Sequence, residues 1–596
     1  MFQSFEVTAR PEQGPPRLSM LRGELEAEGL DGFLVPRADA HQGEYVSARD
    51  ERLAWLTGFT GSAGFCAVLK DIAGVFIDGR YRTQVKAQVA SDFTPVPWPE
   101  TSLANWLRDQ LPDGGRVGFD PWLHTPGQIA QAHETLEGSA VELVQSPNLV
   151  DRIWLDQPAP AAEPAKVHPI EFAGESHGEK RARLGKALSA QGATAAVITL
   201  PDSLCWLLNI RGADIPRNPI AQGFAVLHAS GAVDLFMDPS KLDNVRDHLR
   251  ADVMCHAPGA FLDHLTGLEG PVLLDKSSVP VVVADAVGDR VQWGDDPCAL
   301  PKACKNDAEI AGSAEAHLRD GAAVVELLCW LDGQDPGSLH ETQVVTQLET
   351  YRRRDNALQD ISFETIAGTG PNGAIMHYRV TEETDSLLQD GHLIVLDSGG
   401  QYLDGTTDIT RTIAIGTPPD EARTAFTRVL MGMIAMSRLN WPKGLAGRDI
   451  EAIGRAPLWY AYQDFDHGLG HGVGAYLSVH EGPQRLSRVG TVVLQPGMIL
   501  SNEPGYYREG AFGIRIENLI VAQEATPPVG GDAHRDMLNW RTLTFAPIDR
   551  RLIVIDMLDQ PTRQWLNAYH AETLEKIGPR VSDQARAWLE QACAPL

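Results

Sequence analysis

Two stretches near the C-terminal end of the chain constrain its fold most, because each has the pattern of an antiparallel hairpin with a carboxylate on either side of the tip. HLIVLDSGGQYLDGTTDITRTIAIG has an Asp-Gly turn signal at 404–405, and ILSNEPGYYREGAFGIRIENLIV has a Glu-Gly signal at 509–510. Glycine-containing turns between β-branched runs favour two-stranded hairpins. The two carboxylates of each pair should therefore be near neighbours on adjoining strands. The pairs are Asp397 with Asp408, and Glu503 with Glu517.

Between the two hairpins, the stretch HGLGHGVGAYLSVHEGP supplies His467, His471 and His480. Carboxylates with an imidazole suit divalent ions such as Mn²⁺, Co²⁺ or Zn²⁺, whereas a structural zinc cage needs more nitrogen or sulfur ligands. Two ions about 3.5–4 Å apart share a water, lower its pKa and polarise a carbonyl. Without ions, clustered carboxylates repel one another and take up protons. The pattern predicts a two-metal hydrolytic site. The alternative is ordinary turn carboxylates, but all four lie beside apolar β-runs.

The charge, the apolar runs and the cysteine spacing of the chain indicate which partners and which cellular compartment to expect. The formal net charge is -28, which argues against a nucleic-acid or anionic-membrane partner. The start, MFQSFEVTARPEQGPP, has no apolar signal-peptide core, and no run approaches the ~18 apolar residues of a membrane span. The seven cysteines are scattered without a close C-x-x-C pair, as is typical of thiols in a reducing compartment. We expect a cytoplasmic protein.

A chain of 596 residues exceeds what one hydrophobic core supports. Proline-punctuated stretches at 156–169 and 295–306 indicate linkers, so the expected domains are 1–160, 161–300 and 301–596. The first two share one order of elements: a helix ending at Gly29 or Gly192, a strand, a Trp-Leu pair, a glycine-containing loop and another strand. This order predicts a duplicated α/β domain. The Trp-Leu pairs are Trp55-Leu56 and Trp206-Leu207.

The third domain mixes helices with hairpins instead of alternating them. A long amphipathic helix should begin at an Asn306 cap, and two further helices are expected within 422–439 and 447–462. Segregated helices and antiparallel strands are typical of an α+β domain. The terminal sixty residues predict a strand over 541–555 and a helix over 561–577.

One glycine motif suggests a different activity. Residues 368–373, GTGPNG, match the dinucleotide fingerprint. Pro371 and the strand-like stretch 374–380 remove the helix N-terminus that would bind a pyrophosphate, so we expect instead a loop that presents His377. His480-Glu481 lacks the second histidine of H-E-x-x-H, and no G-x-S-x-G motif is present.

The five expected ligand residues and their neighbours resemble the metal-binding motifs of the pita-bread metallopeptidases. The motifs in this chain are LDSG, TTDITRT, GHGVG, NEPG and RIEN. Within that superfamily the chain is similar to the aminopeptidase P family in its long, three-domain cytosolic form, and GFTGSAG and DGRY extend the likeness into the first domain. The resemblance implies a pita-bread catalytic domain with a C-terminal extension after two α/β domains. It also implies two divalent metals, with manganese favoured, substrates with proline at the second position, and a homodimer. The implied metal ligands are Asp397, Asp408, His471, Glu503 and Glu517.

The resemblance further implies roles for the other polar residues. A hydroxide bridging the metals attacks the carbonyl before proline, and Glu503 accepts its proton while remaining a ligand. His467 and His480 correspond to substrate-binding and oxyanion-stabilising imidazoles, and His377 to a proton-shuttling imidazole in contact with substrate. Arg515, on the same strand face as Glu517, orients a carboxylate ligand. Tyr507 lines the proline pocket.

Two other readings stay open. A prolidase uses the same metal set but cuts dipeptides only, and the length and duplicated N-terminal domains favour the aminopeptidase. A non-catalytic interaction protein on this fold, or a metal-free creatinase-like enzyme, would be expected to lack ligands. All five ligand positions are present.

Overall fold

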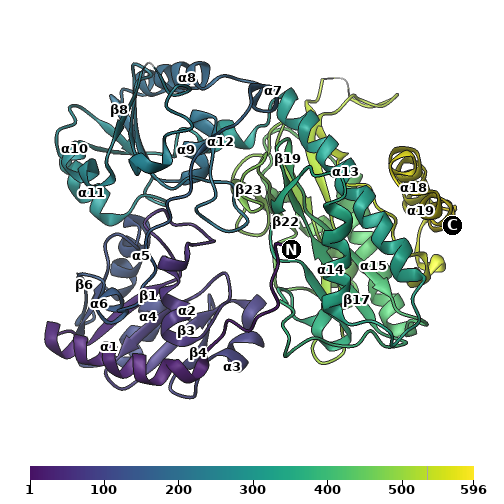
Figure 1. Cartoon of the computed structure of the whole chain (residues 1–596), viewed down its shortest axis with the longest axis horizontal. Helices are drawn as coiled ribbons and strands as arrows, with labels where there is room; N and C mark the ends of the chain where they lie inside the picture. The colour runs from purple at the N-terminus through teal and green to yellow at the C-terminus, as the bar shows by residue number, and fades with distance from the viewer. Residues whose placement is uncertain (251, 533) are drawn as a thin grey trace. The chain divides into compact units, whose positions relative to one another are not determined.

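The computed structural model describes residues 1–250, 252–532 and 534–596. The chain divides into two compact units. One comprises Thr8–Ile170 and Glu175–Ala299, and the other comprises Met1–Val7, Glu171–Gly174 and Leu300–Leu596. Figure 1 shows the order of the elements along the chain by colour.

The first of these units contains two six-stranded sheets. One is built from β1 (Gly32–Pro36), β2 (Phe65–Leu69), β3 (Ala73–Ile77), β4 (Thr94–Pro97), β5 (Gly115–Phe119) and β6 (Val141–Gln145), in the order β4-β3-β2-β1-β5-β6. The other is built from β8 (Ala195–Ile198), β10 (Phe224–His228), β11 (Val233–Phe236), β12 (Val253–His256), β13 (Val272–Leu274) and β14 (Val291–Trp293), in the order β12-β11-β10-β8-β13-β14.

The two sheets repeat one topology. The first strand of each pairs antiparallel with the second strand and parallel with the fifth, and the third and fourth strands pair in parallel. The helices also correspond, and each Trp-Leu pair lies in the second helix of its domain. The predicted duplication of an α/β domain is therefore confirmed. The helices are α1 (Gly14–Glu28), α2 (Arg52–Thr57), α4 (Leu103–Gln110) and α5 (Pro126–Leu136), then α8 (His177–Ala190), α9 (Pro201–Leu208), α10 (Phe261–Thr266) and α11 (Val281–Val287).

The C-terminal unit begins with the long helix that the sequence predicts. Helix α13 (Asp307–Asp332) is 26 residues long, and the Asn306 side chain accepts from the Glu309 N–H while the Glu309 carboxylate accepts from the Asn306 N–H. This reciprocal cap satisfies two backbone donors at the helix start. Helix α13 packs against α14 (Glu341–Arg352) through Leu327, Leu331 and Val345. The unit's other main helices are α15 (Asp420–Ser437), α17 (Ala452–Trp459), α18 (Gln560–Ile577) and α19 (Asp583–Ala592).

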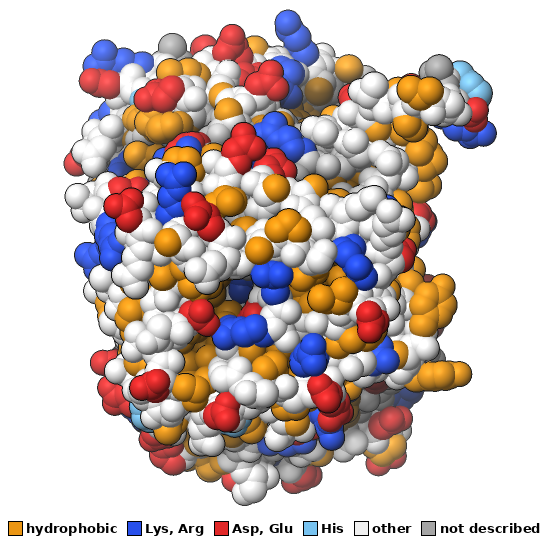
Figure 2. Space-filling model, turned by 90° about the vertical axis from the view of Figure 1, so that its right-hand side faces the viewer, with side chains coloured by type: hydrophobic (Ala, Val, Ile, Leu, Met, Phe, Trp, Pro, Cys, Tyr) orange, Lys and Arg blue, Asp and Glu red, His pale blue; other side chains and the backbone are white. Residues whose placement is uncertain are grey.

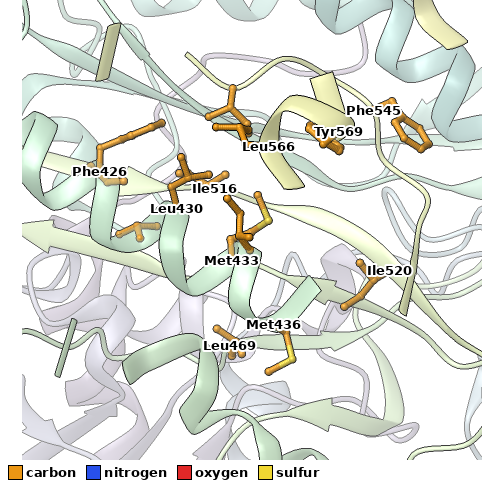
Figure 3. Packing of buried hydrophobic residues seen from close by; sticks show 14 of the residues in the cluster. Phe426, Leu430, Met433, Met436, Leu469, Ile516, Ile520, Phe545, Leu566 and Tyr569 are labelled. Atoms are coloured by element: carbon orange, nitrogen blue, oxygen red, sulfur yellow. The ribbon is translucent and has the colours of Figure 1, made fainter. Parts of the chain in front are cut away.

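The core of this unit forms around α15. Phe426, Leu430 and Met433 recur at helical spacing and are fully buried. Figure 3 shows them near Ile516, which lies beside Glu517 in the second predicted hairpin, and near Leu566 of α18. At roughly 1.5–3 kcal/mol for each large apolar side chain, this packing holds the helix against the sheet that carries the candidate site.

Three sheets and a short hairpin complete the unit. The first two are three-stranded, in the orders β15-β18-β19 and β16-β17-β20, and the third follows the order β21-β28-β27-β24-β22-β23. Strands β25 and β26 pair with each other. Their bounds are β15 (Leu358–Ile361), β16 (Ile366–Thr369), β17 (Leu393–Ser398), β18 (Gly400–Tyr402), β19 (Gly405–Thr406), β20 (Ile409–Ala414), β21 (Asn440–Pro442), β22 (Gly470–Gly472), β23 (Glu481–Leu486), β24 (Ile499–Asn502), β25 (Gly505–Arg508), β26 (Phe512–Arg515), β27 (Asn518–Glu524) and β28 (Met537–Thr542).

Two strand predictions are wrong. Residues 374–380 form a turn instead of a strand, and β28 ends at Thr542 instead of continuing to residue 555. Beyond Thr542, the backbone N–H groups of Ala546 and Ile548 donate to Tyr569 Oη and His570 Nε2 of α18. Side chains of a helix thus replace a neighbouring strand as hydrogen-bond partners.

None of the described helices is long and apolar enough to cross a membrane.

On the face shown in Figure 2, basic and acidic side chains are interspersed among apolar ones. All seven cysteines are free thiols.

Candidate metal centre

The first predicted hairpin is confirmed. Asp397 lies near the end of β17, opposite Thr410 of β20. The chain turns back after Tyr402, which pairs with Gly405 across β18 and β19. Asp408 then lies directly before β20, so both carboxylates lie at the same end of the β17–β20 pair.

The second hairpin follows the same plan. Strands β25 and β26 close the tip at residues 509–511, and below it β24 and β27 pair Asn502 with Asn518. Glu503 follows β24 directly, and Glu517 directly precedes β27. Both glutamates therefore lie at the point where the hairpin changes from one sheet to the next.

Backbone and side-chain hydrogen bonds join the two hairpins. The Glu517 N–H donates to the Thr410 carbonyl at 3.1 Å, and Thr410 Oγ1 donates to Glu517 Oε2 at 2.8 Å. His471 of β22 completes the group, with Nε2 lying 3.5 Å from Asp408 Oδ2 and 3.6 Å from Glu503 Oε1. Ligand atoms of Asp408, His471 and Glu517 all lie within 4.8 Å of one another.

Three carboxylates share a pattern in which one oxygen faces a protein group and the other has no partner. Arg515 Nη2 donates to Asp397 Oδ2 at 2.6 Å, and Thr410 holds Glu517 Oε2. Among the described residues, nothing hydrogen-bonds to the second oxygen of Asp397, Asp408 or Glu517, although all three are buried. Buried carboxylate oxygens without a donor are costly. A divalent cation is the group that satisfies several of them at once.

The electrostatics of these groups support the same conclusion. Burial, together with repulsion by Asp397, raises the pKa of Asp408 well above its ordinary value. Burial and repulsion by Asp408 raise the pKa of Glu517 in the same way, and burial and repulsion by Glu517 raise the pKa of Glu503 to about 7. The Arg515 cation alone does not offset four carboxylates. The residues present therefore fit a pair of divalent ions, which would supply the missing positive charge.

The imidazole of His471 is oriented as a metal ligand requires. Its Nδ1 lies 2.9 Å from the Gly472 carbonyl oxygen, and because a carbonyl only accepts, Nδ1 carries the proton. The Nε2 lone pair is thereby directed at the carboxylates, as in metal sites where a backbone carbonyl sets the tautomer. The ring of His480 lies edge-on to His471, with centroids 4.3 Å apart. The structure thus places His480 beside the predicted ligands.

A hydrogen-bond chain leads from the carboxylates to His467. Arg515, which bonds Asp397, also donates from Nη1 to Tyr507 Oη at 2.6 Å. Tyr507 Oη lies 2.9 Å from His467 Nε2, and His467 Nδ1 lies 2.7 Å from the Gly468 carbonyl oxygen. The Tyr507 hydroxyl therefore accepts from Arg515 and donates to His467. These hydrogen bonds link Arg515, which was expected to orient a carboxylate ligand, to Tyr507 and His467, which were expected to contact substrate.

His377 lies half-buried in the turn after the 3₁₀ segment Gly370–Ala374. That segment packs on β26 so closely that a Cβ on Gly513 would lie 1.6 Å from the Gly373 carbonyl oxygen. The glycine pattern at 368–373 therefore serves close backbone packing, which explains it without a dinucleotide. Glu341 of α14 braces the same segment, accepting from the Thr369 N–H and from Tyr378 Oη.

Sequence reasoning missed a buried network under the first hairpin. Arg352 pairs with Asp320 at 2.6 Å and donates to Ser398 Oγ at 3.0 Å, and Thr407 Oγ1 donates to Asp320 Oδ2 at 3.0 Å. Ser398 directly follows Asp397 in the chain, and Thr407 directly precedes Asp408. Asp320 and Arg352 come from α13 and α14, and no short-range spacing in the sequence signals their contact. The network positions the strand ends that carry the two aspartates.

Comparison with known proteins matches most of the chain to one architecture. The family model of metallopeptidase family M24 matches residues 311–524, and a model of its C-terminal region matches 536–596. Two models of the creatinase/prolidase N-terminal domain match residues 17–153 and 156–309. The fold and the site together define a metallopeptidase of the M24 class, with a pita-bread domain after two creatinase-type domains.

Full-length relatives narrow the class. A probable Xaa-Pro aminopeptidase P of Laccaria bicolor is 36% identical over 601 residues, covering 97% of this chain and 93% of the relative. Aminopeptidase P2 of Arabidopsis thaliana is 36% identical, covering 95% and 86%. The crystal structure of X-prolyl aminopeptidase from Caenorhabditis elegans, described as a cytosolic enzyme with a di-nuclear active site, has a TM-score of 0.93 and 32% identity, covering 98% and 99%. The chain belongs to the Xaa-Pro aminopeptidase P family.

Proposed function

We propose that this chain hydrolyses the N-terminal Xaa-Pro bond of peptides with two divalent ions, preferably Mn²⁺, held by Asp397, Asp408, His471, Glu503 and Glu517. The observation that carries the proposal is the set of partnerless, buried oxygens on Asp397, Asp408 and Glu517 next to an aimed histidine nitrogen. The names of the full-length relatives support the same reaction, and the neighbour's cytosolic description supports action in the cytosol.

When bound, the two ions supply Lewis acidity, which polarises the scissile carbonyl and lowers the pKa of a water. The chain's own residues then direct the protons. Glu503, directly after β24 and beside His471, accepts the proton of the attacking water. His480, beside His471, is placed to donate to the oxyanion, and His377 and His467 orient the peptide. Arg515 aligns Asp397 through their ion pair.

The substrate class follows from proline chemistry and local charge. An acylated proline nitrogen has no N–H, so an enzyme that recognises that N–H binds Xaa-Pro bonds poorly. A site rich in carboxylates instead attracts the cationic amino terminus of a peptide. When the carboxylates bind the amino terminus of a peptide whose second residue is proline, the scissile carbonyl lies near the ions. Binding then does not need the backbone N–H that proline lacks.

The deciding experiment is hydrolysis of Arg-Pro-Pro and of Arg-Pro after treatment with a chelator, with and without added Mn²⁺. We expect release of arginine from the tripeptide, loss of that activity on chelation and its recovery with Mn²⁺. Activity confined to the dipeptide would instead identify a prolidase. Absence of both activities, together with absence of bound metal, would identify a non-catalytic member of the fold.

Metal affinity should fall as the pH falls. Because the pKa of Glu503 is about 7 in the metal-free chain, a proton competes with the metal below that pH. This one proton makes the Kd of Mn²⁺ about tenfold weaker at pH 6 than at pH 8, and the raised pKa values of Asp408 and Glu517 add to the effect. Isothermal titration in buffers of different ionisation enthalpy measures both Kd and proton release. A Kd for Mn²⁺ that does not change with pH would contradict the proposal that protons on these carboxylates compete with the metal.

The substitution Gly513→Ala should displace the segment that precedes His377. The added methyl group would overlap the Gly373 carbonyl oxygen, and a shift of about 1 Å near a site costs roughly 10²-fold in rate. We expect kcat to fall by that order with bound metal unchanged, as measured by steady-state kinetics and metal analysis. In the control Gly259→Ala, the Cβ meets nothing within 4 Å. Equal kcat values for the two variants would contradict the proposal that the segment carrying His377 contributes to catalysis.

A further inference from the structure

A second group of metal-ligand side chains lies in the N-terminal unit, in the domain of α8–α11. Asp234 of β11 faces the side of the sheet covered by α10, and three histidines surround it. His228 comes from β10, His256 from β12 and His264 from α10. Four separate elements thus direct one carboxylate and three imidazoles to one point (the α10 domain is labelled in Figure 1).

The distances divide the group into three candidate ligands and one supporting residue. His228 Nε2 lies 2.7 Å and His264 Nε2 lies 3.3 Å from Asp234 Oδ2. Ligand atoms of these three residues all fall within 4.8 Å of one another. His256 Nε2 instead lies 2.7 Å from the other carboxylate oxygen, Oδ1. This is the position of a residue that orients a carboxylate ligand from behind.

The hydrogen bonding of the group is incomplete without a further ligand. His264 Nε2 points at the same oxygen as His228, yet it is buried and makes no hydrogen bond within the described part of the chain. The ring is held in that direction by an edge-on contact with Phe236 at 5.1 Å. An imidazole nitrogen that lies beside a carboxylate oxygen without hydrogen-bonding to it is available as a metal ligand.

The charge of the group points to a cation. Over the described residues, the ion-pair partners of Asp234 are these three histidines, and no lysine or arginine is among them. Within the described part of the chain, the carboxylate therefore has no lysine or arginine as an ion-pair partner. The four side chains are roughly a seventh to a third exposed (14%, 29%, 26% and 27%), which leaves an ion a path of entry.

We propose that His228, Asp234 and His264 form a zinc site separate from the catalytic pair, with His256 supporting the carboxylate. Two imidazoles and a carboxylate are the ligand types of Zn²⁺, and three protein ligands leave its fourth tetrahedral position to water. The site would clamp α10 to β10 and β11. It contains none of the residues assigned to catalysis, so its role is to stabilise the N-terminal unit.

Zinc analysis of matched variants tests the site. Wild-type chain, Asp234→Asn and the double variant His228→Ala/His264→Ala are equilibrated with Zn²⁺, freed of unbound metal and measured by plasma mass spectrometry. We expect each cluster variant to hold one zinc ion per chain fewer than wild type, with peptidase activity unchanged. The control His133→Ala, an exposed histidine on α5, should keep the wild-type zinc content. Because the readout is a difference, it is independent of how many ions the catalytic site binds.

Equal zinc content in wild type and in both cluster variants would overturn the proposal. Crystals of the unmutated chain grown with Zn²⁺ supply a second readout that does not depend on folding of a variant. An anomalous peak at the zinc edge between His228 and His264 supports the site. Density for imidazoles bonded only to Asp234, without such a peak, would show a proton-linked cluster and no metal site.

Discussion

Replacing Glu517 by glutamine will lower kcat/KM for Arg-Pro-Pro by at least about 10³-fold and remove bound metal. Glu517 Oε2 accepts from Thr410, and Oε1 has no hydrogen-bond partner among the described residues. A carboxylate oxygen of Glu517 lies within 4.8 Å of ligand atoms of Asp408 and His471. A glutamine can keep the Thr410 contact, but it brings an N–H₂ donor or a neutral oxygen to the place where an anionic ligand is needed. Plasma mass spectrometry and steady-state kinetics on the same preparation measure both effects.

The same substitution should stabilise the metal-free chain. The pKa of Glu517 is raised in the folded state, so above the ordinary carboxyl pKa the folded state binds more protons than the unfolded state. Stability then falls as the pH rises through this window. Glutamine has no charge to bury, so we expect a higher Tm than wild type at pH 8 without metal, and a lower Tm with Mn²⁺ present.

The matched control is Glu524→Gln, at the exposed end of β27, the strand that Glu517 directly precedes. Its activity, metal content and Tm should equal those of wild type. Retention of full metal content and activity by Glu517→Gln would exclude Glu517 from the metal centre. A lower Tm in the metal-free state would contradict the repulsion among the buried carboxylates.

Replacing Glu503 by glutamine will lower kcat by about 10²–10⁴-fold, the usual contribution of a general base. At position 517, a glutamine whose amide oxygen keeps the Thr410 contact turns its N–H₂ group toward the ions. At position 503, a glutamine can keep its amide oxygen as a ligand, but it loses the ability to accept a proton. We therefore expect most of the metal to remain bound at saturating Mn²⁺. The Kd of Mn²⁺ should also depend less on pH, because the group with a pKa of about 7 is gone.

The comparison between the two glutamate variants distinguishes a residue that only binds metal from one that also acts as the general base. Pre-steady-state kinetics at saturating Mn²⁺ should show slow chemistry in Glu503→Gln with substrate binding intact. Glu509→Gln, at the tip of the same hairpin, is the control and should match wild type. If Glu503→Gln turned over at the wild-type rate with full metal content, another residue would have to accept the proton.

The local elements of this chain could be read from its sequence because their causes are local. Asn306 and Glu309 cap α13 within one helical turn, and the glycine turns at 405 and 510 close each hairpin between apolar runs. These signals also place each pair of carboxylates on its hairpin. The repeated order of helix, strand and Trp-Leu pair similarly shows the duplicated domain.

Contacts between distant parts of the chain needed the tertiary structure. Thr410 meets Glu517 across 107 positions, and Arg352 reaches Ser398 across 46, so no short window of sequence contains both partners. Residues 543–555 have a strand-like pattern, yet the N–H groups of Ala546 and Ile548 bond to side chains of α18, because a backbone N–H bonds to whichever acceptor the packing supplies.

The two proposed metal centres show this division of information most clearly. Spacing alone identified the hairpin carboxylates, because turns bring residues close in sequence together in space. Asp234 and its histidines lie on three strands and a helix whose order in the sheet follows from long-range pairing. Turn and cap geometry depends on neighbouring residues and can be read from the chain. The meeting of side chains from separate elements depends on which faces pack together, and only the folded structure decides that.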